Sequence, residues 1–166
     1  MAQQNSFDVT TGVDLQEVDN AVNQATKEIA QRYDFKGTNC TVELDRGKNL
    51  IRVDADDEYR LTAVLDVLRT KLHKRGVPLK NLKESKLEQA SLGRVRQELT
   101  LTQGIPSDTA KEIARAIKDR KMKNVQVSIQ GDQLRVTSPS RDALQETIAF
   151  LKSEDYGVEL NFGNYR

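Results

Sequence analysis

The sequence has only one cysteine and no long apolar run, and each of these features excludes a class of protein. Cys40 alone cannot form a disulfide within the chain or supply a thiolate metal cluster. No segment approaches the roughly 18 apolar residues that a membrane-spanning helix needs. The stretch 1–8 has neither the basic start nor the apolar core of a secretory signal. These absences predict a cytoplasmic protein that does not enter a membrane.

A strong net charge is also missing. The chain has 26 Lys and Arg residues against 25 Asp and Glu residues, which gives a formal net charge of +1. Domains dedicated to nucleic-acid binding are often strongly basic. We therefore expect any contact with a nucleic acid to depend on a local group of cations, because the chain has no basic field of its own.

The motifs of common nucleotide-processing enzymes are absent as well. The sequence contains no G-x-x-x-x-G-K-[ST] loop, no G-x-G-x-x-G fingerprint and no G-x-S-x-G elbow. Its only histidine, His73, lies in a basic helix end with no evident carboxylate partner, and the usual ligand clusters of metal sites are missing. The sequence thus predicts a protein that is not an enzyme and that uses no cofactor or metal.

An internal duplication organises the residues that are present. Each half of the chain shows the order strand, helix, strand, strand, helix, strand, and Ile51-Arg52-Val53 in the first half corresponds to Leu134-Arg135-Val136 in the second. The order predicts an α+β fold of two ferredoxin-like units, each with two helices on one face of a four-stranded antiparallel sheet. We place the first unit in residues 1–90 and the second in residues 91–166, with a last strand over Val158–Phe162.

One face of each predicted sheet is left without helices, and strand alternation places arginines on it. Arg52 and Arg135 occupy equivalent positions on central strands, and Arg96 points the same way. A guanidinium there can clamp a phosphate or stack on a base. It can equally form a solvated ion pair, such as Arg52 with Asp54 or Arg96 with Glu98. Both interpretations remain open, and Ile129 is assigned to the opposite, core-facing set.

Aromatic residues are scarce on these faces. None falls in the outward set, so the base-stacking mode of RNA-recognition motifs is not predicted. Contacts with phosphate groups and with nucleic-acid shape remain as the expected mode of binding.

Several motifs spread over nearly the whole chain resemble the bacterial YajQ family. They include Arg32-Tyr33-Asp34-Phe35-Lys36-Gly37, Gln103-Gly104-Ile105, Gln130-Gly131-Asp132 and the ending Phe162-Gly163-Asn164-Tyr165-Arg166. The resemblance implies that the two ferredoxin-like units exchange their N-terminal strands, residues 5–10 and 94–102. It also implies nucleotide binding, with tRNA, GTP or cyclic di-GMP as ligands, and a regulatory role. It supplies no catalytic residues.

We therefore predict a nucleotide- or nucleic-acid-binding protein that captures phosphate with basic side chains. The predicted site residues are Arg32, Lys36, Arg52, Arg96, Arg135 and Arg166. The alternative is a protein–protein interaction adaptor that docks partners on its open sheet faces. An unrecognised enzyme is a third hypothesis, and it would need convergent polar residues in a deep pocket. The sequence does not determine the oligomeric state.

Overall fold

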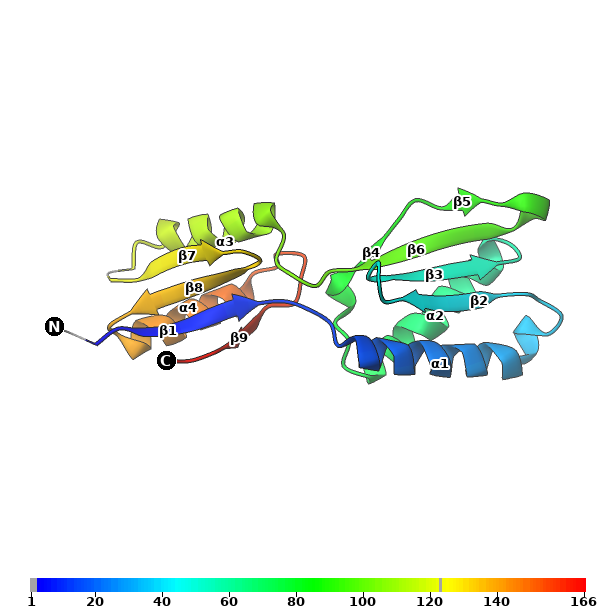
Figure 1. Cartoon of the computed structure of the whole chain (residues 1–166), viewed down its shortest axis with the longest axis horizontal. Helices are drawn as coiled ribbons and strands as arrows, with labels where there is room; N and C mark the ends of the chain where they lie inside the picture. The colour runs from blue at the N-terminus through cyan, green and yellow to red at the C-terminus, as the bar shows by residue number, and fades with distance from the viewer. Residues whose placement is uncertain (1–2, 123) are drawn as a thin grey trace. The chain divides into compact units, whose positions relative to one another are not determined.

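The computed structural model describes residues 3–122 and 124–166 and contains two compact units (Figure 1). The terminal unit combines the chain up to Gly12 with Gln103–Arg166, and the middle unit is Val13–Thr102. Each unit has two helices and an antiparallel sheet, so the predicted α+β fold with two ferredoxin-like units is confirmed. Among the described residues, no helix is both long enough and apolar enough to span a membrane.

The middle unit has the strand order β2-β3-β6-β4, with the short β5 also pairing with β6. Helices α1 and α2 pack side by side and enclose an apolar core against the sheet. The carboxylates of Asp14 and Asp57 cap these helices by accepting hydrogen bonds from the backbone N–H groups of Gln16 and Arg60. The elements are α1 (Leu15–Gln31), η1 (Tyr33–Phe35), β2 (Thr41–Asp45), β3 (Leu50–Ala55), α2 (Glu58–Lys74), η2 (Leu79–Asn81), β4 (Leu82–Glu84), β5 (Glu88–Gln89), η3 (Ser91–Gly93) and β6 (Val95–Leu101).

The terminal unit repeats this plan with the strand order β7-β8-β1-β9. Its core joins residues from both ends of the chain, because Phe7 and Val9 of the first strand pack with Ile113, Leu134 and Ile148. The elements are β1 (Asn5–Thr10), α3 (Ser107–Asp119), β7 (Gln126–Gln130), β8 (Gln133–Ser138), α4 (Arg141–Ser153) and β9 (Asn161–Gly163).

The strand pairing confirms the exchange of N-terminal strands. Strand β1, which leads into α1 of the middle unit, pairs with β8 of the terminal unit from Asn5↔Ser138 to Val9↔Leu134. Strand β6, which leads into α3 of the terminal unit, pairs with β3 of the middle unit. Each sheet therefore takes its inner strand from the segment that precedes the other unit's first helix.

Three details of the sequence interpretation are wrong. The sheet of the middle unit has five strands and not the four predicted, because the short β5 also pairs with β6. The last strand is Asn161–Gly163 and not Val158–Phe162. Asn161 pairs with Thr10, which is the last residue of β1. The residues before Asn161 therefore have no β1 residue opposite them to pair with. Ile129 is not in the core, since 44% of its surface is exposed on β7, an edge strand.

Candidate functional site

Arg52 lies on the open face of the middle unit between strands that both carry acidic residues. Its guanidinium nitrogens lie 4.0 Å from Glu43, 3.8 Å from Asp45 and 3.4 Å from Glu98. Glu43 and Glu98 are its direct cross-strand neighbours on β2 and β6. A phosphate at this position would meet three carboxylates as well as one guanidinium, which is an unfavourable balance of charge.

Arg96 is also paired, with a different partner from the one considered in the sequence. Its Nε lies 3.4 Å from Oδ2 of Asp54, and Arg94 binds the same carboxylate. Arg94 also donates to Asp56 at 3.1 Å, and the hydrogen bond with Asp54 raises the pKa of its guanidinium. Asp54 thus pairs with both Arg94 and Arg96, whereas Arg52 forms its ion pairs with other carboxylates.

Arg32 and Lys36 flank the short η1 turn of the middle unit. Arg32 forms a bidentate pair with Asp34, at 3.0 and 2.6 Å, and its guanidinium lies 5.2 Å from the centre of the Phe35 ring. The hydrogen bond from Arg32 lowers the pKa of the Asp34 carboxyl. Lys36 lines a cavity of about 340 Å³ together with Phe35 and Cys40. Arg32 is therefore already paired with Asp34, and Lys36 lies beside a cavity.

The structure brings Arg135 and Arg166 together on the open face of the terminal unit. They line a concave surface of about 430 Å³, here called the open-face hollow, with Asp8, Thr10, Gln133, Gly163 and Asn164. Arg135 donates from Nε to Oδ1 of Asp8 at 2.9 Å, and Asn164 donates to Oδ2 at 2.6 Å. Among the described residues, no Asp or Glu carboxylate lies within 4 Å of the Arg166 guanidinium. Within the described residues, the hollow therefore has one arginine in direct contact with a carboxylate, Arg135, and one, Arg166, that acts on Asp8 only from a distance.

Asp8 organises this hollow from a buried position. Its surface is only 4% exposed. The hydrogen bond from Arg135 lowers the pKa of its carboxyl, although burial acts in the opposite direction. The carboxylate is therefore ionised near neutral pH and fixes the Arg135 guanidinium on the sheet surface.

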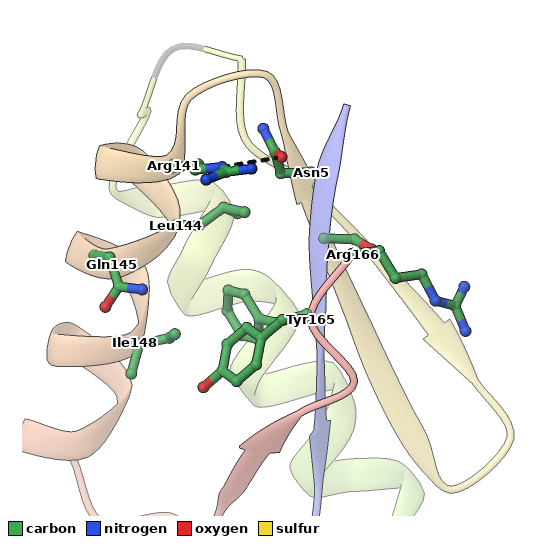
Figure 2. Close-up of a pocket in the computed structure, with 9 residues that line it drawn as sticks. Asn5, Arg141, Leu144, Gln145, Ile148, Tyr165 and Arg166 are labelled. Atoms are coloured by element: carbon green, nitrogen blue, oxygen red, sulfur yellow. Dashed lines mark hydrogen bonds between the residues drawn. The ribbon is translucent and has the colours of Figure 1, made fainter. Parts of the chain in front are cut away.

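A second concave site lies on the helix side of the same sheet (Figure 2). This α4 cleft has a volume of about 380 Å³ and runs between α4 and strand β1. Its α4 wall is formed by Arg141, Leu144, Gln145 and Ile148, and its other wall by Asn5, Ser6, Phe7, Tyr165 and Arg166.

The residues after β9 build one wall of the α4 cleft because they continue the sheet beside β1. Ser6 and Arg166 exchange backbone hydrogen bonds of 3.2 and 3.0 Å. Successive residues of an extended chain point to opposite faces. Tyr165 accordingly lies on the α4 side of β1 and the Arg166 side chain on the opposite side, as Figure 2 shows.

The α4 cleft combines apolar surface with a cation, Arg141, that has no carboxylate partner among the described residues. Tyr165 is 63% exposed, and the centre of its ring lies 6.5 Å from the centre of the Phe7 ring at an interplanar angle of 45°. Arg141 donates to the side-chain oxygen of Asn5 at 3.4 Å, and within the described part of the chain no carboxylate pairs with it. The amide of Gln145 lies on the same wall. An aromatic face, an amide and a guanidinium suit a planar polar ring that carries an anionic group.

The described lining of the α4 cleft lacks several side chains that are common in catalytic and metal sites. The nine described residues that line it include no aspartate, glutamate, histidine or cysteine. Across residues 3–122 and 124–166, no three His, Cys, Asp or Glu side chains are grouped as metal ligands.

Sequence reasoning did not name Arg141 or Gln145, and it weighed Tyr165 only together with Arg166, against the alternative of a frayed terminus. It looked for cations on the open sheet faces and at the corner after the first helix, whereas Arg141 and Gln145 lie on the helix side of the sheet. A usable signal was present in the ending Asn164-Tyr165-Arg166, where alternation places an aromatic and a cation on opposite faces. That Arg141 lines the same cleft as Tyr165 could not be predicted from the sequence, because it depends on how α4 packs against β1.

Fold and concave sites together define a class: a two-unit ferredoxin-like protein with exchanged strands and ligand-sized hollows on both faces of one sheet. The chain belongs to the YajQ family, since the family described as "Nucleotide-binding protein YajQ-like" matches residues 5–166. The recognition made from the motifs is thereby confirmed.

Relatives of similar length support the same assignment. A protein of Trichlorobacter lovleyi named "Nucleotide-binding protein" is 53% identical over 161 residues, which cover 97% of this chain and 98% of that protein. "Nucleotide-binding protein Acid345_2028" of Koribacter versatilis is 52% identical over 162 residues, covering 98% and 97%. A "Nucleotide-binding protein" of Alkaliphilus oremlandii is 51% identical over 166 residues and covers both chains completely.

Proposed function

We propose that this protein binds nucleotides without transforming them, with the base in the α4 cleft against Tyr165 and a phosphate at Arg141. The observation that carries the proposal is the presence, in one cleft of about 380 Å³, of an exposed tyrosine and of a guanidinium that has no carboxylate partner among the described residues. Volumes of about 300–1,000 Å³ are typical of small-molecule sites. The names of the relatives support nucleotides as the ligand class.

The open-face hollow extends this proposal to nucleic acids. Arg166 lies on the other side of the chain segment that carries Tyr165, and Arg135 lies in the same hollow. A single-stranded nucleic acid with one base in the α4 cleft would place its next phosphate groups near Arg166 and then near Arg135. The ligands to test are GTP, cyclic di-GMP and tRNA, and the proposed role is regulatory binding in the cytoplasm.

The lining supports binding without catalysis, because its described residues supply two hydroxyl side chains, those of Ser6 and Tyr165, but no histidine, aspartate, glutamate or cysteine that could activate them. General acid–base and nucleophilic mechanisms need a histidine, carboxylate, cysteine or activated hydroxyl within reach of the substrate. Incubation of GTP with the protein, followed by chromatography of the nucleotides, should return GTP at the rate of the protein-free control. Faster conversion that scales with protein concentration would contradict this part of the proposal.

Isothermal titration of GTP and cyclic di-GMP into the full chain tests the site. Tyr165→Ala and Arg141→Gln should each weaken binding about tenfold or more, since stacking on one ring or one charge-assisted contact contributes about 1–3 kcal/mol. The matched controls are Tyr33→Ala, an exposed tyrosine of the middle unit, and Arg115→Gln, an exposed arginine on α3. Both controls should bind as the unaltered protein does.

The remaining predicted residues are tested in the same series. Weakened binding in Arg52→Gln, Arg96→Gln, Arg32→Gln or Lys36→Gln, with Tyr165→Ala unchanged, would place the site on the middle unit and overturn the assignment to the α4 cleft. No binding of any nucleotide or tRNA would reject nucleotide binding and favour the protein-interaction adaptor.

A further inference from the structure

Strand β7 is an edge strand without the usual protection against pairing. In the described part of the chain it has β8 on one side and no strand on the other. Its five residues, Gln126–Gln130, include no charge and no proline. Proteins commonly protect exposed strand edges with charged residues, prolines, bulges or short length. The edge strand β2 of the middle unit follows that rule, since it carries Glu43 and Asp45.

The sequence of β7 is nearly the same when read in either direction. Gln126-Val127-Ser128-Ile129-Gln130 is symmetric about Ser128, with a glutamine at each end and a β-branched apolar residue on each side of the centre. Antiparallel strands related by a two-fold axis pair each residue with its mirror position. Pairing β7 with β7 of a second copy about Ser128 would set glutamine beside glutamine and valine beside isoleucine.

The backbone of β7 is in the correct phase for this pairing. Gln130 and Gln133 close a two-residue turn in the β7–β8 hairpin, so they form a hydrogen-bonded pair. Pair types alternate along an antiparallel ladder, which directs the backbone groups of Ser128 toward β8 and those of Val127 and Ile129 toward the free edge. A two-fold axis at Ser128 places Val127 opposite Ile129 of the second copy. The backbone N–H and C=O groups of both residues point toward the free edge, so they can form hydrogen bonds across the interface.

The side chains also match in this arrangement. A two-fold axis perpendicular to the sheet keeps the helix-bearing faces of both copies on the same side. Val127 and Ile129 share the face of Val136 and Leu134 by register, and 44% of the Ile129 surface is exposed in the single chain. Pairing would cover part of that surface with the second copy's valine, and no like charges would meet along the strand.

From these observations we infer that β7 is a self-association edge, through which two copies of this chain join their four-stranded sheets into one continuous antiparallel sheet. This interface is independent of the proposed nucleotide function. A five-residue ladder is small for an interface, so the dimer is expected to be weak, with a Kd on the order of 100 μM.

Sedimentation of the full chain over a concentration series tests the interface. The unaltered protein should dimerise reversibly, and Ser128→Lys should be monomeric because the two-fold axis places the two introduced lysines opposite each other. Thr41→Lys, which adds the same charge to the exposed start of β2, should dimerise normally. A monomer at all concentrations up to about 1 mM would overturn the inference, as would dimerisation of Ser128→Lys that equals that of Thr41→Lys.

Disulfide cross-linking tests the register. In a Cys40→Ser background, Ser128→Cys should cross-link to itself on mild oxidation, since the opposed Cα atoms would be about 4.5 Å apart. Gln130→Cys should not, because its own copies would be about 13 Å apart along the ladder. Equal cross-linking of both variants, or none with Ser128→Cys, would overturn the proposed pairing. If β7 instead bound a strand of another protein, the purified chain would remain a monomer and Ser128→Cys would not cross-link to itself, which would also overturn the inference.

Discussion

Asp8 and Arg135 form an ion pair between residues 127 positions apart in the sequence, at 2.9 Å from Nε to Oδ1. They face each other directly in the β1–β8 ladder. The pair therefore joins the exchanged N-terminal strand to a central strand of the terminal unit. It also places Arg135 in the open-face hollow, so the same contact serves the fold and a candidate ligand surface.

Asp8→Asn should destabilise the terminal unit by about 1–2 kcal/mol, because a buried hydrogen-bonded carboxylate loses its charge while Arg135 keeps its own. Denaturant unfolding, followed by circular dichroism, measures the loss. Glu43→Gln removes one exposed partner of Arg52 and should change the unfolding free energy by less than about 0.5 kcal/mol. Equal effects of the two substitutions would contradict the structural role of the Asp8 pair.

The Asp8 carboxyl also predicts how stability depends on pH. Its pKa in the folded protein is lowered from the ordinary value of 3.8, chiefly by Arg135, so the unfolded chain binds the proton more tightly. The stabilisation is complete well above pH 3.8 and is lost as the pH falls through the lowered folded-state pKa. The melting temperature of the unaltered protein should therefore fall more steeply with acidification than that of Asp8→Asn. Glu28 and Asp34 also have lowered pKa values, but they contribute equally to both proteins. Parallel acid profiles would refute the assignment to Asp8.

Gly104 is required by close contact and not by an unusual backbone angle. A Cβ at this position would lie 2.6 Å from Cβ of Asp132, and the backbone N–H of Ile105 donates to the Asp132 carbonyl at 2.9 Å, which fixes the approach. Gly104→Ala should cost about 1–3 kcal/mol in unfolding free energy. Adding Asp132→Gly should recover most of that loss, because it removes the clashing side chain.

Gly163→Ala is the control for this prediction, since a Cβ there meets nothing within 4 Å. Its melting temperature should stay close to that of the unaltered protein. A Gly104→Ala variant that melts together with Gly163→Ala would show that the approach between Gly104 and Asp132 is not constrained.

The salt dependence of nucleic-acid binding separates phosphate contacts from stacking. For a short single-stranded oligonucleotide, each phosphate contact contributes about 0.7 to the slope of log K against log salt concentration. Arg166→Gln should reduce the magnitude of the slope by about that amount, whereas Tyr165→Ala should weaken binding with little change in slope. Fluorescence anisotropy at several salt concentrations measures both. An unchanged slope in Arg166→Gln would remove the open-face hollow from the proposed path.

Local patterns in the sequence were sufficient to predict the order of elements and the two-fold repeat. Alternation over Leu50–Ala55 and Gln133–Ser138 marks two equivalent strands with the same burial pattern. Such patterns depend on neighbouring residues only, so they can be read without a structure. Ile129 shows the limit of this reasoning, because alternation selects the face of a strand but does not reveal that the strand lies at an edge.

The repeat itself, the ferredoxin-like plan and the candidate arginines were determined by the sequence alone, because side-chain periodicity and turn residues act over a few positions. Tertiary structure decided what each arginine does. Arg52 and Arg135 occupy the same place in the repeat, yet Arg52 meets three carboxylates and Arg135 meets one. Glu43 and Asp45 lie on the neighbouring strand of the same hairpin as Arg52. Glu98 and Asp8, however, come from strands distant in the sequence, whose register and exchange no local pattern encodes. The α4 cleft arises in the same way, since packing of α4 against β1 brings Tyr165 and Arg141 to one site.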